Sequence, residues 1–240
     1  MCGRYATTRS AADLSALFES YDDTGDGLGP DYNVAPTDPV PIVRISERLG
    51  GRVLSVARWG LLPPWAKDAR GGARMINARA ETVATTRAYA QPFARRRCLV
   101  PADGWYEWLR SDGVKQPYFM TRSDGGVLAF AGIWSVWRDA GTPVLTCSVV
   151  TTAAVGDLAL VHDRMPLLLP RQRWAGWLGG GGDPGELLAP PTAESLAGIE
   201  LRPVGGSVGD VRNDGPELVS RVPAQPLGSG SAEPVTQTLF

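Results

Sequence analysis

The first regular pattern in the chain is helical and follows Ser10. Leu14, Leu17, Phe18 and Tyr21 are three or four residues apart, which is the spacing of one face of an α-helix. Ser10 is a residue type that caps helix N-termini, because its hydroxyl accepts a hydrogen bond from the first turn. The pattern predicts a short amphipathic helix that ends near residue 20.

Most of the remaining chain is predicted to form short strands. Runs rich in β-branched and aromatic residues alternate with turns, and Leu49–Gly51 and Ser123–Gly126 each predict a hairpin. The segment 32–37 is extended, because its prolines exclude a helix. The predicted strands are 41–46, 52–59, 98–101, 104–109, 118–122, 127–134, 144–151 and 167–169. Predicted helical segments are 91–97, 153–160 and 171–178, with another that begins near Glu81.

This succession of elements indicates the α+β class. The many strands and few helices predict a single domain built on a curved, mostly antiparallel β-sheet with a barrel-like core and flanking helices. A length of 240 residues is enough for one large domain with its own core. The Pro/Gly/Ser-rich segment 223–240 is predicted to be a disordered C-terminal tail.

Composition narrows the class of protein. With 43% hydrophobic and 20% charged residues the chain has the composition of a soluble globular protein, and we expect neither a membrane span nor a secretory signal. Three widely spaced cysteines argue against a disulfide framework, and a single histidine argues against a zinc site. We therefore expect a cytoplasmic monomer, associated with the nucleoid if the organism is bacterial, with no metal and no cofactor.

Charge is distributed unevenly, although the net charge is only −1. Nine Lys/Arg residues lie between Arg58 and Val100, against only Asp68 and Glu81, while the segment after Gly180 is acidic. This asymmetry predicts a local basic surface that binds a polyanion such as nucleic acid. A solvated basic face without a partner is the alternative.

The N-terminus carries an unusual chemical opportunity. Removal of the initiator methionine would leave Cys2 with an α-amino group, whose ordinary pKa is about 7.7–8.0, beside its own thiol. The amine can condense with an aldehyde to a Schiff base, and the thiol can then close a thiazolidine ring. We expect a neighbouring cation such as Arg4 to favour the thiolate. A cysteine at this position by chance is the alternative.

Two further residues are candidates for acid–base chemistry. Glu107 follows Trp105 and Tyr106 and precedes Trp108, so its carboxyl is expected to be desolvated and its pKa raised toward the range of a general acid–base. The alternative is a glutamate on the exposed face of an edge strand. His162 is expected in a turn, where functional residues are common, although a lone histidine is more often structural.

A polar and aromatic set lies in or near the basic segment. Asn77 and Arg79 are two residues apart, so in an extended segment both side chains lie on the same side and are suited to holding a phosphate or a polar sugar atom. Trp65 lies close to the arginines and is suited to stacking on unpaired bases. Capping, a surface ion pair and a buried tryptophan are the ordinary alternatives.

Taken together, these motifs resemble the SOS-response-associated peptidase (SRAP) family of abasic-site processing proteins. The resemblance covers residues 2–222, which we assign as one SRAP domain. The motifs are Met1–Tyr5, Tyr32–Pro36, Trp59–Leu61 with Trp65, Ile76–Thr82, Ala102–Trp108, Val150–Ala153, His162–Pro166 and Val208–Asn213.

The resemblance implies a protein that senses abasic sites in single-stranded DNA and links itself to them covalently. It implies that the amine and thiol of Cys2 form the linkage, that Glu107 shuttles protons, and that His162 assists sugar ring-opening and β-elimination. The family also implies lyase-type Schiff-base chemistry and, in some members, self-removal of the initiator methionine.

The resemblance also implies which residues bind DNA. Asn77 positions Cys2 and the opened sugar, and Arg4 and Arg79 hold phosphates. Trp65 forms a wall of the DNA channel, and Asn33 has a supporting role. Because a single strand bends into a narrow cleft more easily than a duplex, we expect a preference for single-stranded or junction substrates.

Two other classes of function stay open from the sequence. An N-terminal-cysteine amidohydrolase would use the thiolate as nucleophile and the amine as base. A non-covalent binding module for single-stranded DNA would need the basic surface but not Cys2.

Overall fold

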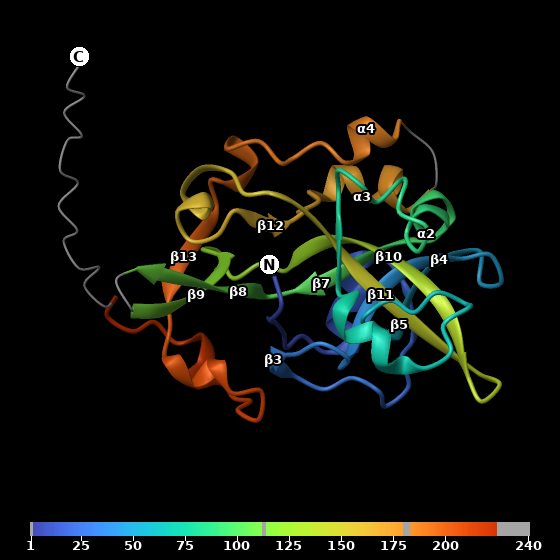
Figure 1. The fold of residues 1–240 in the computed structure, drawn as a ribbon, viewed down its shortest axis with the longest axis horizontal. Coiled ribbons are helices and arrows are strands. Elements are labelled where there is room, and N and C mark those ends of the chain that lie inside the picture. The colour runs from blue at the N-terminus through green and yellow to red at the C-terminus, as the bar shows by residue number, and fades with distance from the viewer. Residues whose placement is uncertain (1, 112–113, 180–182, 225–240) are drawn as a thin grey trace, which may run out of the picture.

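The computed structural model describes residues 2–111, 114–179 and 183–224. Two β-sheets form the body of the molecule, and the blue start of the chain lies where they meet (Figure 1). The helices are α1 (Ala11–Phe18), α2 (Ala90–Arg95), α3 (Arg171–Leu178) and α4 (Pro184–Leu187). Short 3₁₀ helices are η1 (Ala69–Arg74), η2 (Gly156–Leu160), η3 (Glu194–Leu196), η4 (Gly206–Gly209) and η5 (Pro216–Val219).

The smaller sheet has five antiparallel strands. Their order across the sheet is β13 (Ile199–Pro203), β9 (Val114–Arg122), β8 (Gly104–Ser111), β1 (Tyr5–Thr7) and β3 (Asp31–Val34). The N-terminal strand β1 therefore lies beside β8, with Tyr5 opposite Trp105. This pairing brings the start of the chain next to the strand that carries Glu107.

The larger sheet closes on itself. Its strands are, in order, β12 (Arg164–Pro166), β11 (Thr142–Ala153), β10 (Leu128–Asp139), β7 (Arg97–Ala102), β4 (Pro39–Ser46), β5 (Gly51–Trp59) and β2 (Tyr21–Asp23), and β6 (Asn77–Arg79) pairs with β11. A further pairing of β5 with β11 joins β11, β10, β7, β4 and β5 into a ring. The predicted α+β fold with a barrel-like, mostly antiparallel core is thereby confirmed.

The hydrophobic core connects the two sheets. Tyr5 packs against Trp59 and Phe130 with ring centroids 5.0 and 5.9 Å apart, and Trp105 packs against Phe130 at 6.0 Å. Edge-to-face aromatic pairs of this kind stabilise a core beyond the apolar area that they bury. Cys2 belongs to the same cluster, so the core fixes the position of the chain's first residues.

Several predicted elements are confirmed. Helix α1 begins after Ser10, whose hydroxyl accepts a hydrogen bond from the Asp13 N–H at 3.1 Å, and α3 has the predicted bounds. The two helices meet outside the ring, where Phe18 stacks on Trp174 with centroids 4.5 Å apart. The hairpin across Leu49–Gly51 also forms, between β4 and β5.

The predicted hairpin across Ser123–Gly126 is wrong. Strand β9 pairs with β8 and β13 in the smaller sheet, whereas β10 pairs with β7 and β11 in the ring. The turn carries the chain from one sheet to the other, and the Ser123 N–H donates to the Gly198 carbonyl. Local turn chemistry predicts a reversal of direction, but not which sheet each strand joins.

Three smaller predictions also need correction. No helix forms at Glu81, because the chain stays beside β11 through an Ala80 N–H bond to Thr151 O (2.8 Å) and then makes turns. The helix expected at 153–160 is the shorter η2, since β11 continues to Ala153. The strand expected at 167–169 lies earlier, at β12, and Leu168 makes only an isolated bridge.

The tail predicted to be disordered falls outside the described residues from 225 onward. In the described ranges, no helix is both long and apolar enough to cross a bilayer.

Candidate active site

A cleft of about 770 Å³ opens beside strands β8 and β9 of the smaller sheet. Four parts of the chain line it: the N-terminal segment, the β8–β9 hairpin, the end of η2 with the turn after it, and Gly209 at the end of η4. The residues that matter for chemistry are Gly3, Arg4, Glu107, Trp108, His162 and Asp163. The fold therefore brings two of the predicted catalytic residues, Glu107 and His162, to one cavity.

Glu107 is buried in the middle of β8, with only 3% of its surface exposed, and lies opposite Tyr118 on β9. Burial raises the pKa of its carboxyl to about 7, because desolvation penalises the charged form. The prediction of a desolvated glutamate is confirmed, and the alternative of an exposed edge position is wrong. At neutral pH this carboxyl is present in both protonation states, as a proton shuttle requires.

Cys2 is fully buried beside this carboxyl. Its carbonyl accepts a hydrogen bond from Asn77 Nδ2 at 2.7 Å, which fixes the backbone of the residue. Burial, and secondly the nearby Glu107 carboxylate, raise the pKa of the Cys2 thiol well above its ordinary value. The expected thiolate, stabilised by the charge of Arg4, is therefore wrong for this structure, because burial raises the pKa of the thiol and Arg4 lowers it only through a backbone hydrogen bond. The sulfur is held as a neutral thiol.

His162 begins the turn after η2, and its backbone N–H donates to Leu158 O at 3.2 Å. Its Nδ1 lies 2.9 Å from the Arg164 N–H, which donates to it, and 2.8 Å from an Asp163 carboxylate oxygen. Only the first contact suits a neutral ring, whereas the second needs a protonated one. Burial lowers the pKa of His162, so we assign the neutral ring with its proton on Nε2.

Arg4 and Asn33 form a buried polar network beside the cleft. Arg4 Nη1 donates to Asn33 Oδ1 and, at 3.1 Å, to Val208 O, while Nη2 donates to Gly209 O at 3.3 Å. Asn33 Nδ2 donates to the carbonyls of Asp210 (3.0 Å) and Asn213 (2.8 Å). The pair thus anchors the segment 208–213 against the N-terminus.

This network gives a prediction for stability. Replacing Asn33 by alanine removes the acceptor of one Arg4 hydrogen bond and the donor to two part-buried carbonyls, so we expect the free energy of unfolding to fall by about 2 kcal/mol. Urea unfolding measures the change. The matched control is Asn213→Ala, whose exposed side chain makes one bond to Ser207 O (2.9 Å), and an equal loss in both variants would contradict the role of Asn33.

Asn77 and Arg79 lie on β6, which runs parallel to β11. Ala78 between them is buried, so the two polar side chains lie on the same side of the strand, as predicted. Asn77 is half-buried against Cys2, whereas Arg79 is exposed. Beside them Arg164 makes a two-pronged ion pair with Glu81 (2.6 and 3.0 Å).

Trp65 is 55% exposed and is not among the residues that line the cleft. The guanidinium of Arg87 lies 5.2 Å from the centroid of its ring, a cation–π contact. Arg87 was not predicted from the sequence, because it is 22 residues from Trp65 and no local pattern indicates their contact. Arg164 lies in the predicted motif His162–Pro166, but its ion pair with Glu81 was not predicted.

Part of the basic segment serves the fold instead of a surface. Arg97 is buried, and its guanidinium donates to Trp177 O and, at 3.1 Å, to Phe93 O. Arg96 lies over the ring of Trp134, 5.4 Å from the centroid. Other cations of the basic segment 58–100 are exposed, among them Arg79 and Arg87, which lies over the ring of Trp65.

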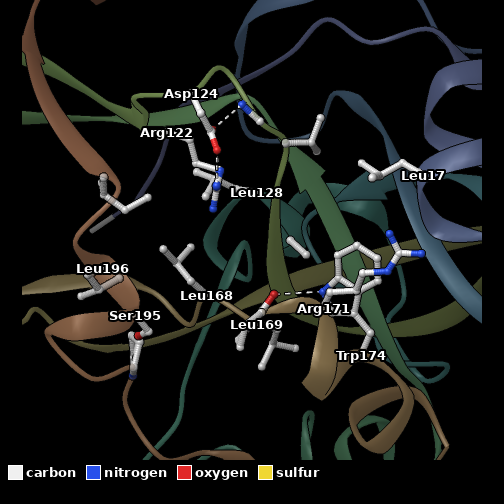
Figure 2. A pocket seen from close by; sticks show the side chains of 16 residues that line it. Leu17, Arg122, Asp124, Leu128, Leu168, Leu169, Arg171, Trp174, Ser195 and Leu196 are labelled. Atoms are coloured by element: carbon white, nitrogen blue, oxygen red, sulfur yellow. Dashed lines mark hydrogen bonds and ion pairs between the residues drawn. The ribbon is translucent and has the colours of Figure 1, made fainter.

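A second cavity of about 310 Å³ lies between the start of β10, α3 and the η3 segment. Figure 2 shows an apolar floor that includes Leu128, Leu168 and Trp174, and a rim where Arg122 pairs with Asp124. None of the predicted site residues lines this cavity. The predicted residues Arg4, Glu107 and His162 line the first cleft instead.

Comparison with known proteins shows the family to which the chain belongs. A family model described as "SOS response associated peptidase (SRAP)" matches residues 1–211. The abasic site processing protein YoqW of Bacillus subtilis is 35% identical, over 91% of this chain and 99% of that protein. The abasic site processing protein YedK of Escherichia coli is 33% identical, over 92% and 100%. A crystal structure of a Bacteroides thetaiotaomicron protein superposes with a TM-score of 0.80 at 23% identity, covering 92% of this chain and 100% of that one.

Proposed function

Because the chain belongs to the SOS response associated peptidase family, we propose that it captures abasic sites in single-stranded DNA through its N-terminal cysteine. The observation that carries the proposal is the buried Glu107 carboxyl, with a pKa of about 7, next to Cys2 in a cleft that His162 also lines. The names of the relatives, which are abasic site processing proteins, support the same substrate.

The first step joins nitrogen to carbon. The neutral α-amine of Cys2, exposed once Met1 has been removed, attacks the C1′ aldehyde of the ring-opened abasic sugar and forms a carbinolamine. Protonated Glu107 gives its proton to the departing hydroxyl, so that water leaves and a C=N bond forms. A carboxyl with a pKa near 7 is suited to this step, because it donates and regains a proton at neutral pH.

The second step closes the ring. The Cys2 sulfur adds to the imine carbon, the C–S bond forms, and the thiol proton passes to the imine nitrogen by way of Glu107. No leaving group departs, and the product is a thiazolidine. The raised pKa of the thiol supports transfer of a proton together with the sulfur, instead of attack by a free thiolate.

His162 and the polar residues on β6 support the substrate in this proposal. The Nε2 proton of a neutral His162 assists opening of the sugar ring, and the same residue serves in β-elimination of the 3′ phosphate from the imine. Asn77 holds the Cys2 backbone through its 2.7 Å bond, while Arg79 and Arg4 attract phosphates and Trp65 stacks on a base. Asn33 supports Arg4. Self-removal of Met1 in this cleft is also part of the proposal.

The test uses a single-stranded oligonucleotide with one abasic site, followed by denaturing electrophoresis. We expect a shifted protein–DNA band from the wild-type chain, none from Cys2→Ala, and a weaker band when the lesion lies in an intact duplex. Absence of the wild-type band would refute the proposal. Binding that survives Cys2→Ala without a band would indicate a non-covalent module, and DNA-independent release of ammonia from glutamine would indicate an amidohydrolase.

A further inference from the structure

We propose that the end of the β8–β9 hairpin is a cationic arm that binds the DNA backbone on one side of the abasic nucleotide only. The arm consists of Trp108, Arg110 and Lys115, which line the same cleft as Glu107 and His162. The inference rests on the proposed function, and it adds a strand-specific docking site to the covalent chemistry.

The geometry places the arm one step away from the chemistry. Arg110 follows Glu107 by three residues along β8 and lies directly opposite Lys115 on β9. Three residues of a β-strand span about 10 Å, which is more than one sugar ring. Arg110 and Lys115 are both exposed and both line the cleft. Although side chains three residues apart leave opposite faces of a strand, the two charges at the cleft wall lie within reach of a nucleotide next to the one at Glu107.

The charges of the arm have no acidic partner. Many arginines elsewhere form ion pairs, for example Arg122 with Asp124, but in the described part of the chain neither Arg110 nor Lys115 does so. The Lys115 ammonium instead lies 5.1 Å from the centroid of the Trp108 ring, a contact that holds it at the cleft wall. Unpaired cations that line a cleft attract a polyanion.

The backbone of the arm adds hydrogen-bond donors. Strand β1 pairs with β8 only at Tyr5 and Ala6, and the Tyr106 N–H then bonds to Arg4 O at 3.0 Å. Beyond this point β8 continues past the end of β1. Alternate residues of a strand direct their N–H groups to the same side, so those of Trp108 and Arg110 point to the edge of β8 beyond the end of β1, where phosphate oxygens can accept them.

The experiment compares Arg110→Ala/Lys115→Ala with a control, Arg48→Ala/Arg138→Ala, which removes two exposed arginines at other hairpins. Binding is measured by fluorescence anisotropy with an oligonucleotide that carries an unreactive tetrahydrofuran site. The salt slope is the change in the logarithm of the binding constant with the logarithm of the salt concentration, and each phosphate contact to a single strand contributes about 0.7 to it. Loss of two contacts should therefore reduce the drop in affinity of the protein between 50 and 200 mM salt by about sevenfold. An unchanged slope would overturn the proposal.

Strand polarity separates this role from a structural one. Oligonucleotides with the lesion at the 5′ end or at the 3′ end carry flanking nucleotides on one side only. The arm variant should lose affinity for only one of these two oligonucleotides. In the salt titration, Trp108→Ala should produce about half of the change in slope seen for the arm variant, because it frees Lys115 alone. Trp108→Phe keeps an aromatic ring beside Lys115 and should leave the slope unchanged. Equal losses on both would refute the one-sided arm. Adduct formation by the wild-type chain on the natural lesion tests the covalent function separately, since the tetrahydrofuran assay needs no aldehyde.

Discussion

A chain that keeps residues ahead of Cys2 is expected to form no detectable adduct with an abasic oligonucleotide, whereas the same chain with Cys2 exposed forms it readily. The α-nitrogen of Cys2 becomes an amide when Met1 or a tag precedes it, and an amide nitrogen does not condense with an aldehyde. A protease-cleavable tag placed directly before Cys2 gives both states from one preparation. Intact mass measures the state of the N-terminus, and denaturing electrophoresis measures the adduct.

The control for this experiment is Cys2→Ser with the N-terminus exposed. It keeps the amine and replaces the sulfur, so we expect Schiff-base formation and strand cleavage to persist while the stable adduct is lost. Borohydride, which reduces imines, should trap that intermediate. A tagged chain that crosslinks as well as the cleaved one would contradict the role of the amine, and would leave the thiol alone as the reacting group.

The sequence indicated more of the site's chemistry than of its geometry. Glu107 was predictable, because aromatic neighbours on both faces of one short strand leave its carboxyl little water wherever the strand lies. The state of the Cys2 thiol was not, since its burial depends on Tyr5 and Trp59, which the fold brings in from two different sheets. Arg4 is adjacent in sequence, but its guanidinium turns to Asn33.

The same division holds for the fold. Local signals such as the Ser10 cap and the glycines between β4 and β5 predicted α1 and one hairpin, because each depends on residues close in sequence. The ring closes through a parallel pairing of Arg58 with Thr146, 88 positions further along the chain. No alternation of apolar and polar residues encodes that partner. The assignment of β9 and β10 to different sheets is non-local in the same way.

Replacing Glu107 by glutamine is expected to slow adduct formation by about 10²–10⁴-fold, the usual contribution of a general acid–base. Glutamine keeps the size of the side chain but cannot give a proton to the leaving hydroxyl. The wild-type rate should rise with pH as the α-amine becomes neutral, at about 7.7–8.0, and fall as Glu107 loses its proton near 7. The wild-type rate of adduct formation plotted against pH should therefore be bell-shaped, whereas the rate of the variant should not fall at high pH. Single-turnover rates from pH 5.5 to 9 would measure both profiles.

Stability supplies an independent check on the same carboxyl. Its pKa is about 7 in the folded chain and 4.5 for the unperturbed group, so the folded state binds more protons between these values. The stability of the wild-type chain therefore falls as pH rises from 4.5 to 7, by on the order of 3 kcal/mol. Glu107→Gln does not titrate at this position, so its stability relative to wild type should rise as the pH rises from 4.5 to 7. A difference in the free energy of unfolding between the two proteins that stays constant over this pH range would show that Glu107 is ionised in the folded state throughout. Glu107 could then not be the acid that protonates the leaving hydroxyl.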